Sequence, residues 1–413
     1  MINQKSFEAV KAASWKSDFC KPLYESYCFS KIPSTLLKLL GLSCDTLPQD
    51  CFHNQTYETV VLFVIDGFGW SFLEKTHHRY PFLSRFFREG IVSKITSQFP
   101  STTAAHITSL CSGLEVAETG IYEWFYYEPI LDRVIAPLLY SYAGDKSTGT
   151  LKGDLTPDEI FPAKTVFQTL QKNKISSTIF QHSSISNSSY SDWMFRGAEM
   201  VPYDNVSKGL QELQSRLGQK GLFYFYIGDI DAVAHRNGLD SKQTAKAIDQ
   251  CFTALENFWR TLPQDQKMAC VVTADHGMTA IDPKTTIYLN QAFPFLEEVL
   301  EKGSDGHPLT PAGSCRDYFL HISPKEVARI KPLLEEGLQG KALICETSEL
   351  IEEGFFGSKP VCKDLLERLG NLVILPYGNN SIWWYEKGRF EQKFYAMHGG
   401  LTREEMETIF LFI

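Results

Sequence analysis

Three continuous apolar runs, each followed by an aspartate, most strongly constrain how this chain folds. The runs and their aspartates are ETVVLFVI (58–65) with Asp66, GLFYFYIG (221–228) with Asp229 and Asp231, and MACVVT (268–273) with Asp275. Runs of this kind are typical of strands buried on both faces of a mostly parallel sheet. Open α/β sheets bind ligands outside the carboxyl ends of their strands, so we expect these carboxylates to share one crevice.

Segments with helical spacing lie between the expected strands. Residues 101–111 form one of them, and residues 241–262 form another, with Ser241 as its expected N-cap. The alternation predicts an α/β fold with a doubly wound, mostly parallel central sheet and helices on both faces. The 413 residues are 43% hydrophobic, which suits either more than one core or one large α/β core that has an insertion.

The chain is expected to consist of a core and two additions. Residues 1–57 predict a helical lead-in, because STLLKLLGL has helical spacing and DTLPQDCFHNQ then supplies helix breakers. Residues 306–375 alternate strand-like and helix-like segments in close succession, which predicts a small inserted α+β subdomain. The main α/β core is then expected at 58–305 and 376–413.

Composition argues against several kinds of partner. The formal net charge of −9 disfavours a nucleic-acid polymer or an anionic membrane surface. No apolar run approaches the roughly 20 residues that span a bilayer, and the N-terminus lacks the apolar stretch of a signal peptide. The ten cysteines are dispersed without a C-x-x-C pair, as in proteins of a reducing compartment. We expect a cytoplasmic protein with a small-molecule substrate; export without a readable signal stays open.

Acidic and imidazole residues occur at spacings suited to metal binding. One pair, in D-x-x-x-H, is four residues apart and fits one helical turn. Another pair, in D-H-G, is adjacent, so joint ligation requires a loop at the end of a strand. The set is Asp66, Asp231, His235, Asp275, His276 and His398. Three carboxylates with three imidazoles suit zinc or manganese, and the recurrence of such residues after strands favours ligation over chance.

The segment SQFPSTTAAHITSLCSG (97–113) places a hydroxyl at the start of an expected helix. Such a residue is usually only a helix cap. Beside a metal, however, a hydroxyl can lose its proton and attack phosphorus, and the N–H groups of a helix N-terminus favour the phosphate's negative charge. Thr102 and Thr103 are both candidates.

As an ordered set, these motifs resemble the alkaline phosphatase superfamily, specifically its type I phosphodiesterase/nucleotide pyrophosphatase branch, from about residue 58 to the C-terminus. The motifs are Asp66 after its strand, the hydroxyl before T-S-L-x-S-G, D-x-x-x-H-x-x-G, D-H-G-M and the late H-G. The resemblance implies two divalent metal ions, zinc with manganese as the alternative.

The resemblance also implies a role for each residue. The ligands of the first metal would be Asp231, His235 and His398, and those of the second Asp66, Asp275 and His276. Thr103, ten residues before Gly113, would be the nucleophile on the second metal, with Thr102 as the fallback.

The sequence departs from the family pattern at two places. His106 stands where the family has a phosphate-holding asparagine, so either His106 or the backbone N–H of residue 103 or 104 would contact the phosphate. Thr119-Gly120 stands where relatives usually have His-Gly. The aromatic run IYEWFYYEP (121–129) either stacks on a nucleobase or forms a packed loop.

The implied activity is hydrolysis of phosphodiester or pyrophosphate bonds of nucleotide-type substrates through a phosphothreonine intermediate. The chain has no C-x-P-x-R, which disfavours a sulfatase, and no arginine in 97–120, which disfavours a monoesterase. The alternatives are a phosphonate hydrolase or phosphomonoesterase on the same two-metal site, and a non-catalytic binding protein that retains the fold. The sequence predicts neither the oligomeric state nor the individual substrate.

Overall fold

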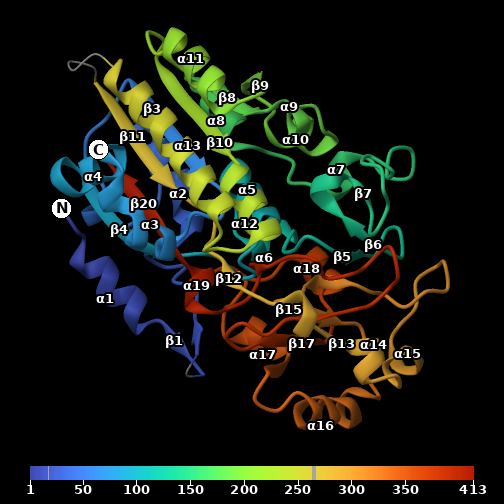
Figure 1. Ribbon diagram of the computed structural model, residues 1–413. Helices are drawn as coiled ribbons and strands as arrows, with labels where there is room; N and C mark the ends of the chain where they lie inside the picture. The colour runs from blue at the N-terminus through green and yellow to red at the C-terminus, as the bar shows by residue number, and fades with distance from the viewer. Residues whose placement is uncertain (17, 263–266) are drawn as a thin grey trace.

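A seven-stranded sheet forms the centre of the computed structural model, which describes residues 1–16, 18–262 and 267–413 (Figure 1). Its order is β4-β20-β11-β3-β10-β8-β9. The strands are β3 Thr59–Ile65, β4 Ile91–Thr96, β8 Ser176–His182, β9 Glu199–Tyr203, β10 Gly221–Ile227, β11 Met268–Thr273 and β20 Glu407–Phe412. Only β20 runs opposite to the other six strands of this sheet. The predicted mostly parallel sheet is confirmed.

Alternate residues of the central strand β3 belong to different hydrophobic cores. Val60, Leu62 and Val64 share a core with helices α2 (Ile32–Leu39), α5 (Thr103–Ser112) and α8 (Val166–Lys172). Val61, Phe63 and Ile65 share the other with α3 (Trp70–Thr76), α4 (Pro81–Glu89), α11 (Val206–Arg216) and α13 (Lys242–Arg260). Since neighbouring side chains on a strand point to opposite faces, helices cover both faces of the sheet, as predicted.

A four-stranded antiparallel sheet lies beside the large one (Figure 1). Its strands are β14 Ala312–Ser314, β15 Asp317–Leu320, β16 Ala342–Glu346 and β17 Leu372–Pro376, in the order β14-β15-β17-β16. Helix α16 (Val327–Gly337) buries Ile330 and Leu334 in the core beneath this sheet. The elements fall in the region for which the sequence predicts an α+β insertion, and the limits of that insertion stay a prediction.

Short strand pairs connect distant segments. Pairing of β12 (Thr279–Ala280) with β19 (Ala396–Met397) brings the segment after β11 beside the late histidine segment. The other short strands are β5 Tyr126–Glu128, β6 Arg133–Ala136, β7 Ser141–Tyr142, β13 Ile287–Tyr288 and β18 Ile382–Trp383. The N-terminal region contains α1 (Gln4–Ala12) and α2, but also the strand pair β1 (Ser14–Trp15) and β2 (Phe19–Cys20), which helical spacing did not indicate.

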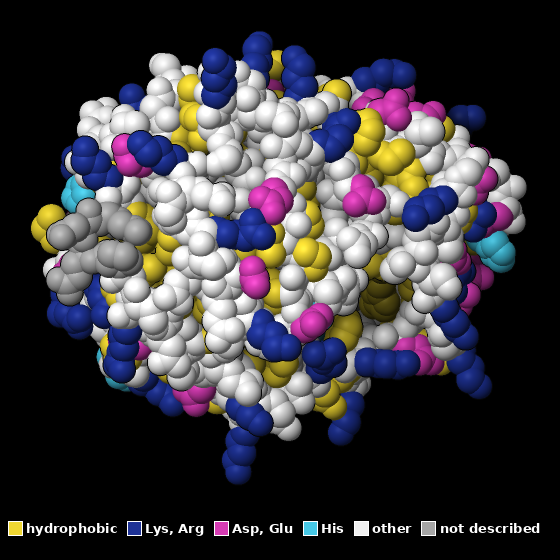
Figure 2. Space-filling model, turned by 90° about the horizontal axis from the view of Figure 1, so that it is seen from above, with side chains coloured by type: hydrophobic (Ala, Val, Ile, Leu, Met, Phe, Trp, Pro, Cys, Tyr) yellow, Lys and Arg dark blue, Asp and Glu magenta, His cyan; other side chains and the backbone are white. Residues whose placement is uncertain are grey.

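The remaining helices are mostly short. They are α6 Val116–Thr119, α7 Pro157–Ile160, α9 Ser183–Ser186, α10 Ser189–Met194, α12 Asp229–Asn237, α14 Leu289–Ala292, α15 Leu296–Val299, α17 Thr347–Glu352, α18 Lys363–Arg368 and α19 Arg403–Met406. Across the ranges that the structure covers, no helix is both long and apolar enough to cross a bilayer. All ten cysteines are free thiols. One face of the molecule shows cationic and acidic side chains interspersed (Figure 2).

Candidate metal centre and nucleophile

The fold brings the six predicted metal ligands from four segments to one edge of the large sheet. Asp66 follows β3, the pair Asp231 and His235 lies on α12 directly after β10, and Asp275 follows β11. Because β3 lies between β10 and β11 and all three are parallel, their carboxyl ends are neighbours. His398 joins them from the residue after β19.

A first group of ligand atoms centres on Asp231. Its Oδ1 lies 3.2 Å from His235 Nε2 and 3.8 Å from His398 Nε2. Asp231 and His235 share one turn of α12, as their four-residue spacing predicts. The three ligand atoms lie within 4.8 Å of one another, close enough to hold one ion.

A second group centres on His276, whose Nε2 lies 3.3 Å from Asp275 Oδ2 and 3.5 Å from Asp66 Oδ1. Ligand atoms of Asp66, Asp231 and His276 also lie within 4.8 Å of one another. Asp231 therefore stands between the two groups, an arrangement absent from the sequence-based division into two separate triads.

Thr103 is the first residue of α5, and its Oγ1 lies 3.1 Å from His276 Nε2. The hydroxyl is therefore beside the second group, at the N-terminus of a ten-residue helix whose first N–H groups favour an anion. The adjacent Thr102 is the N-cap residue, but its side chain makes no capping hydrogen bond.

Backbone carbonyls orient all three imidazoles. The Nδ1 atoms lie 2.7 Å from Ala396 O for His235, 3.0 Å from Gly277 O for His276, and 3.0 Å from Ser101 O for His398. A carbonyl oxygen only accepts hydrogen bonds, so each Nδ1 is the protonated nitrogen. Each Nε2 is thereby left with a lone pair directed into the cluster, as metal-binding histidines require.

The buried carboxylates place negative charge in the cluster, which divalent cations would neutralise. Asp66 Oδ1, Asp231 Oδ1 and Asp275 Oδ2 are buried, and the structure gives these atoms no hydrogen-bond partner among the residues it describes. Burial, and then the charges of Asp275 and Asp231, raise the pKa of Asp66 well above its usual range. Burial likewise raises the pKa of Asp275 to about 7. Oxygen and nitrogen atoms of this kind fit two divalent ions.

Two supporting residues escaped the sequence analysis. The Tyr226 hydroxyl donates to Asp66 Oδ2, which directs Oδ1 toward the cluster. The Gly67 N–H donates to Asp275 Oδ1 at 3.1 Å, and Gly67 has a φ of +68°. A β-carbon there would lie 3.0 Å from Asp231 Oδ1, so the left-handed turn favours glycine and a larger residue would crowd Asp231. A tyrosine at the end of a buried strand was the available signal, because a buried hydroxyl needs a partner.

His106 is fully buried in the scaffold behind Thr103. Its Nδ1 donates to Thr102 O at 2.7 Å, and its Nε2 accepts from Gln98 N–H at 2.8 Å. Burial lowers the pKa of His106 to about 4, which keeps the ring neutral. Both nitrogens are therefore engaged by backbone, which disfavours direct donation from His106 to a ligand.

The aromatic run after the nucleophile segment divides in two. Tyr122 and Tyr126 are fully buried and stack on each other at 5.5 Å between ring centroids, as in a packed loop. Trp124 is 37% exposed, and stacking of this run on a nucleobase stays a prediction.

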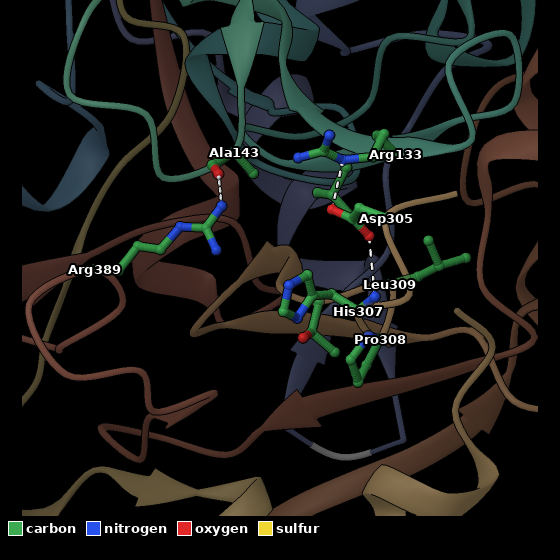
Figure 3. Close-up of a pocket in the computed structure, with 9 residues that line it drawn as sticks. Arg133, Ala143, Asp305, His307, Pro308, Leu309 and Arg389 are labelled. Carbon is green, nitrogen blue, oxygen red and sulfur yellow. Dashed lines mark hydrogen bonds and ion pairs between the residues drawn. The ribbon is translucent and has the colours of Figure 1, made fainter. Parts of the chain in front are cut away.

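A separate small pocket contains none of the predicted site residues (Figure 3). Its volume is about 30 Å³, far below that of a nucleotide site. Its arginines already have partners, since Arg133 pairs with Asp305 at 2.7 Å and Arg389 with Glu386 at 3.2 Å.

A mostly parallel α/β sheet with paired Asp/His clusters and a helix-terminal threonine at its carboxyl edge defines a metal-dependent phosphoester hydrolase. Residues 60–401 match the family model "Type I phosphodiesterase / nucleotide pyrophosphatase", and the chain belongs to this family.

Solved structures with the same fold include two kinds of protein. Murine ectonucleotide pyrophosphatase/phosphodiesterase 5, an inactive variant in complex with AMP, has a TM-score of 0.64 and 17% identity over 86% of this chain and 87% of that one. Phosphonoacetate hydrolase from Sinorhizobium meliloti 1021, in complex with phosphonoformate, has a TM-score of 0.62 and 17% identity over 87% of this chain and 92% of that one. A search of curated proteins finds no match.

Proposed function

We propose that this chain hydrolyses phosphodiester or pyrophosphate bonds of nucleotide-type substrates through a phosphothreonine intermediate on Thr103. The observation that carries the proposal is the position of Thr103 Oγ1, 3.1 Å from His276 Nε2 at the edge of the Asp/His cluster. The murine relative in complex with AMP is an inactive variant in which alanine replaces one threonine, which agrees with a threonine nucleophile.

The six residues named above would hold two divalent ions, with zinc as the first choice and manganese as the second. Bound there, these ions would supply Lewis-acid stabilisation of the charge that develops on the phosphoryl group and would lower the pKa of a neighbouring hydroxyl. Their ligands Asp231 and Asp66 would place them within one cluster.

The chain's own groups then perform two displacements. Thr103 Oγ1 loses its proton and forms a bond to phosphorus, while the bond from phosphorus to the leaving oxygen breaks and that oxygen takes up a proton from water. Water next attacks the phosphorus of the phosphothreonine, the bond from phosphorus to Thr103 Oγ1 breaks, and Oγ1 takes up a proton as the phosphate-bearing product leaves. The backbone N–H groups of residues 103 and 104 at the start of α5 face the negative charge of the phosphoryl oxygens. His106 positions Thr102 and, through it, Thr103.

A diester or pyrophosphate substrate is favoured over a monoester because the deeply buried arginines of the described residues are not part of the cluster. The two most deeply buried arginines are committed elsewhere, Arg316 to Glu405 at 3.0 Å and Arg368 to Glu128 at 2.8 Å. Neither of these two arginines would be free to pair with a monoester's additional negative charge. Buried free thiols at eight of the ten cysteines support our proposal of a cytoplasmic location.

Comparative hydrolysis tests the assignment. Zinc-loaded protein is assayed with the 4-nitrophenyl ester of thymidine 5′-monophosphate, with 4-nitrophenyl phosphate and with phosphonoacetate. We expect kcat/KM to be highest for the diester. A higher kcat/KM for the monophosphate or for phosphonoacetate would replace the proposal with the corresponding hydrolase.

A further inference from the structure

A second group of buried carboxyl oxygens lies outside the Asp/His cluster. In the part of the chain that the structure describes, five carboxylate oxygens are buried without a hydrogen-bond partner. Three belong to Asp66, Asp231 and Asp275 in the candidate metal centre. The other two are Glu123 Oε1 and Asp317 Oδ2, and both side chains are fully buried.

Glu123 and Asp317 meet at one point of the backbone. A β-carbon on Gly399 would lie 2.8 Å from Asp317 Oδ1 and 3.0 Å from Glu123 Oε1, which only glycine avoids. Gly399 directly follows the predicted ligand His398. The two carboxyl groups are thus brought together behind the metal centre from segment 121–125 and from strand β15.

Each carboxyl group is held in the same manner as the predicted metal ligands. In Asp317, Oδ1 accepts from the Ser314 hydroxyl and from Ser314 N–H at 3.1 Å, while Oδ2 has no partner. In Glu123, Oε2 accepts from Trp124 N–H while Oε1 has none. Asp275 shows the same division, because its Oδ1 accepts two N–H groups and its Oδ2 is left for the cluster.

The Thr102 hydroxyl is a third unpartnered atom at this position. Its Oγ1 is buried without a hydrogen-bond partner among the described residues, and the residue is 1% exposed. A threonine at an N-cap normally accepts from the helix N–H groups, yet Thr102 does not. Its side chain lies beside the Glu123 carboxyl instead.

The arginine next to this pair in sequence is already engaged by another carboxylate. Arg316, the residue before Asp317, is engaged by Glu405 through two hydrogen bonds of 3.0 Å. Two carboxyl groups buried this deeply require either a cation or bound protons. An all-oxygen set of two carboxylates and a hydroxyl suits hard ions such as Mg²⁺ and Ca²⁺, whereas the imidazole-containing centre suits zinc.

We propose that Glu123, Asp317 and Thr102 form a third cation site, for a hard divalent ion such as Mg²⁺ or Ca²⁺. An ion bound at this site links Thr102, the residue before Thr103, to segment 121–125 and to β15. This proposal concerns ion binding only and does not depend on the proposed hydrolysis.

Metal analysis of the full-length chain tests the proposal. The protein is stripped with a chelator, loaded with zinc, and equilibrated with millimolar Mg²⁺ or, in a second arm, Ca²⁺; bound ions are then counted by mass spectrometry. We expect two zinc ions and one Mg²⁺ or Ca²⁺ per chain, and the two arms identify the preferred ion. Glu123→Gln and Asp317→Asn should each lose the third ion and keep the zinc.

Three comparisons make this test decisive. Thr102→Val should weaken binding of the third ion, because valine keeps the shape of threonine but lacks its hydroxyl. Thr102→Ser should retain binding, because serine keeps the hydroxyl. Glu128→Gln removes a buried carboxylate that is paired with Arg368, and should leave the ion count unchanged. Added Mg²⁺ or Ca²⁺ should raise the Tm of the wild type but not of Glu123→Gln. A wild-type chain that binds zinc but neither hard ion overturns the proposal and assigns the pair a bound proton.

Discussion

Thr103 Oγ1 lies 3.1 Å from His276 Nε2, while Thr102, one residue earlier, has its hydroxyl beside Glu123. The hydroxyls of the two adjacent threonines therefore contact different residues. Thr103→Ala should lower kcat for a nitrophenyl nucleotide diester by at least about 10³-fold, the order of loss seen when a catalytic group is removed. Zinc content should stay at the wild-type value. Thr103→Ser serves as the control that keeps a hydroxyl; substantial turnover by Thr103→Ala would exclude this nucleophile.

Removal of one hydroxyl should separate metal affinity from folding. Tyr226→Phe deletes the hydrogen bond that orients Asp66, and loss of such a support typically weakens metal binding about 10- to 100-fold. Tyr224→Phe is the matched control on the same strand, because the Tyr224 hydroxyl is buried with no partner within the described ranges. Zinc titration with a competing chelator measures both. Equal affinities in the two variants would contradict the role of Tyr226.

Gly67→Ala should damage both stability and metal binding. The left-handed conformation alone costs a non-glycine residue about 1–2 kcal/mol, and the new methyl group would also press on Asp231. Gly306 has a φ of +77° and open space around its Cα, so Gly306→Ala isolates the conformational cost. Chemical denaturation and zinc content are the measurements. We expect only Gly67→Ala to lose zinc.

Substitution of His106 should change the rate without changing substrate affinity. His106→Phe leaves Gln98 N–H buried without its acceptor, at a cost of about 1–3 kcal/mol in unfolding free energy. The His106 ring contacts backbone on both sides, so its loss should displace Thr103. We therefore expect kcat to fall and KM to stay unchanged. An increase in KM with unchanged stability would instead place His106 on the phosphate.

The buried His321, which directly follows β15, predicts a pH dependence of stability. Burial lowers the pKa of His321 to about 4 in the folded chain, against about 6.5 in the unfolded chain. Between those values the unfolded chain binds the extra proton, so the unfolding free energy decreases as pH falls, by at most about 1.4 kcal/mol per pH unit. His321→Phe should remove this component. Urea denaturation of both proteins between pH 4 and 7 measures the difference; parallel curves would refute it.

Local patterns in the sequence predicted much of the fold and site, because strand burial and helical spacing are encoded over a few residues. The runs before Asp66 and Asp275 are β3 and β11, and Ser241 caps α13 as expected. The position of β20 between β4 and β11 depends on pairing between distant segments, which periodicity does not contain. The meeting of Glu123 with Asp317 escaped prediction for the same reason.

The hydrogen bonds from three imidazoles to Ala396, Gly277 and Ser101 carbonyls have a consequence for how metal affinity evolves in this chain. Preorganisation of the ligands resides in backbone atoms, which no side-chain substitution removes directly. A mutation that shifts β19 or the segment before α5 will therefore weaken metal binding although every ligand is retained. Inherited variation in affinity should accumulate in the loops that present these carbonyls.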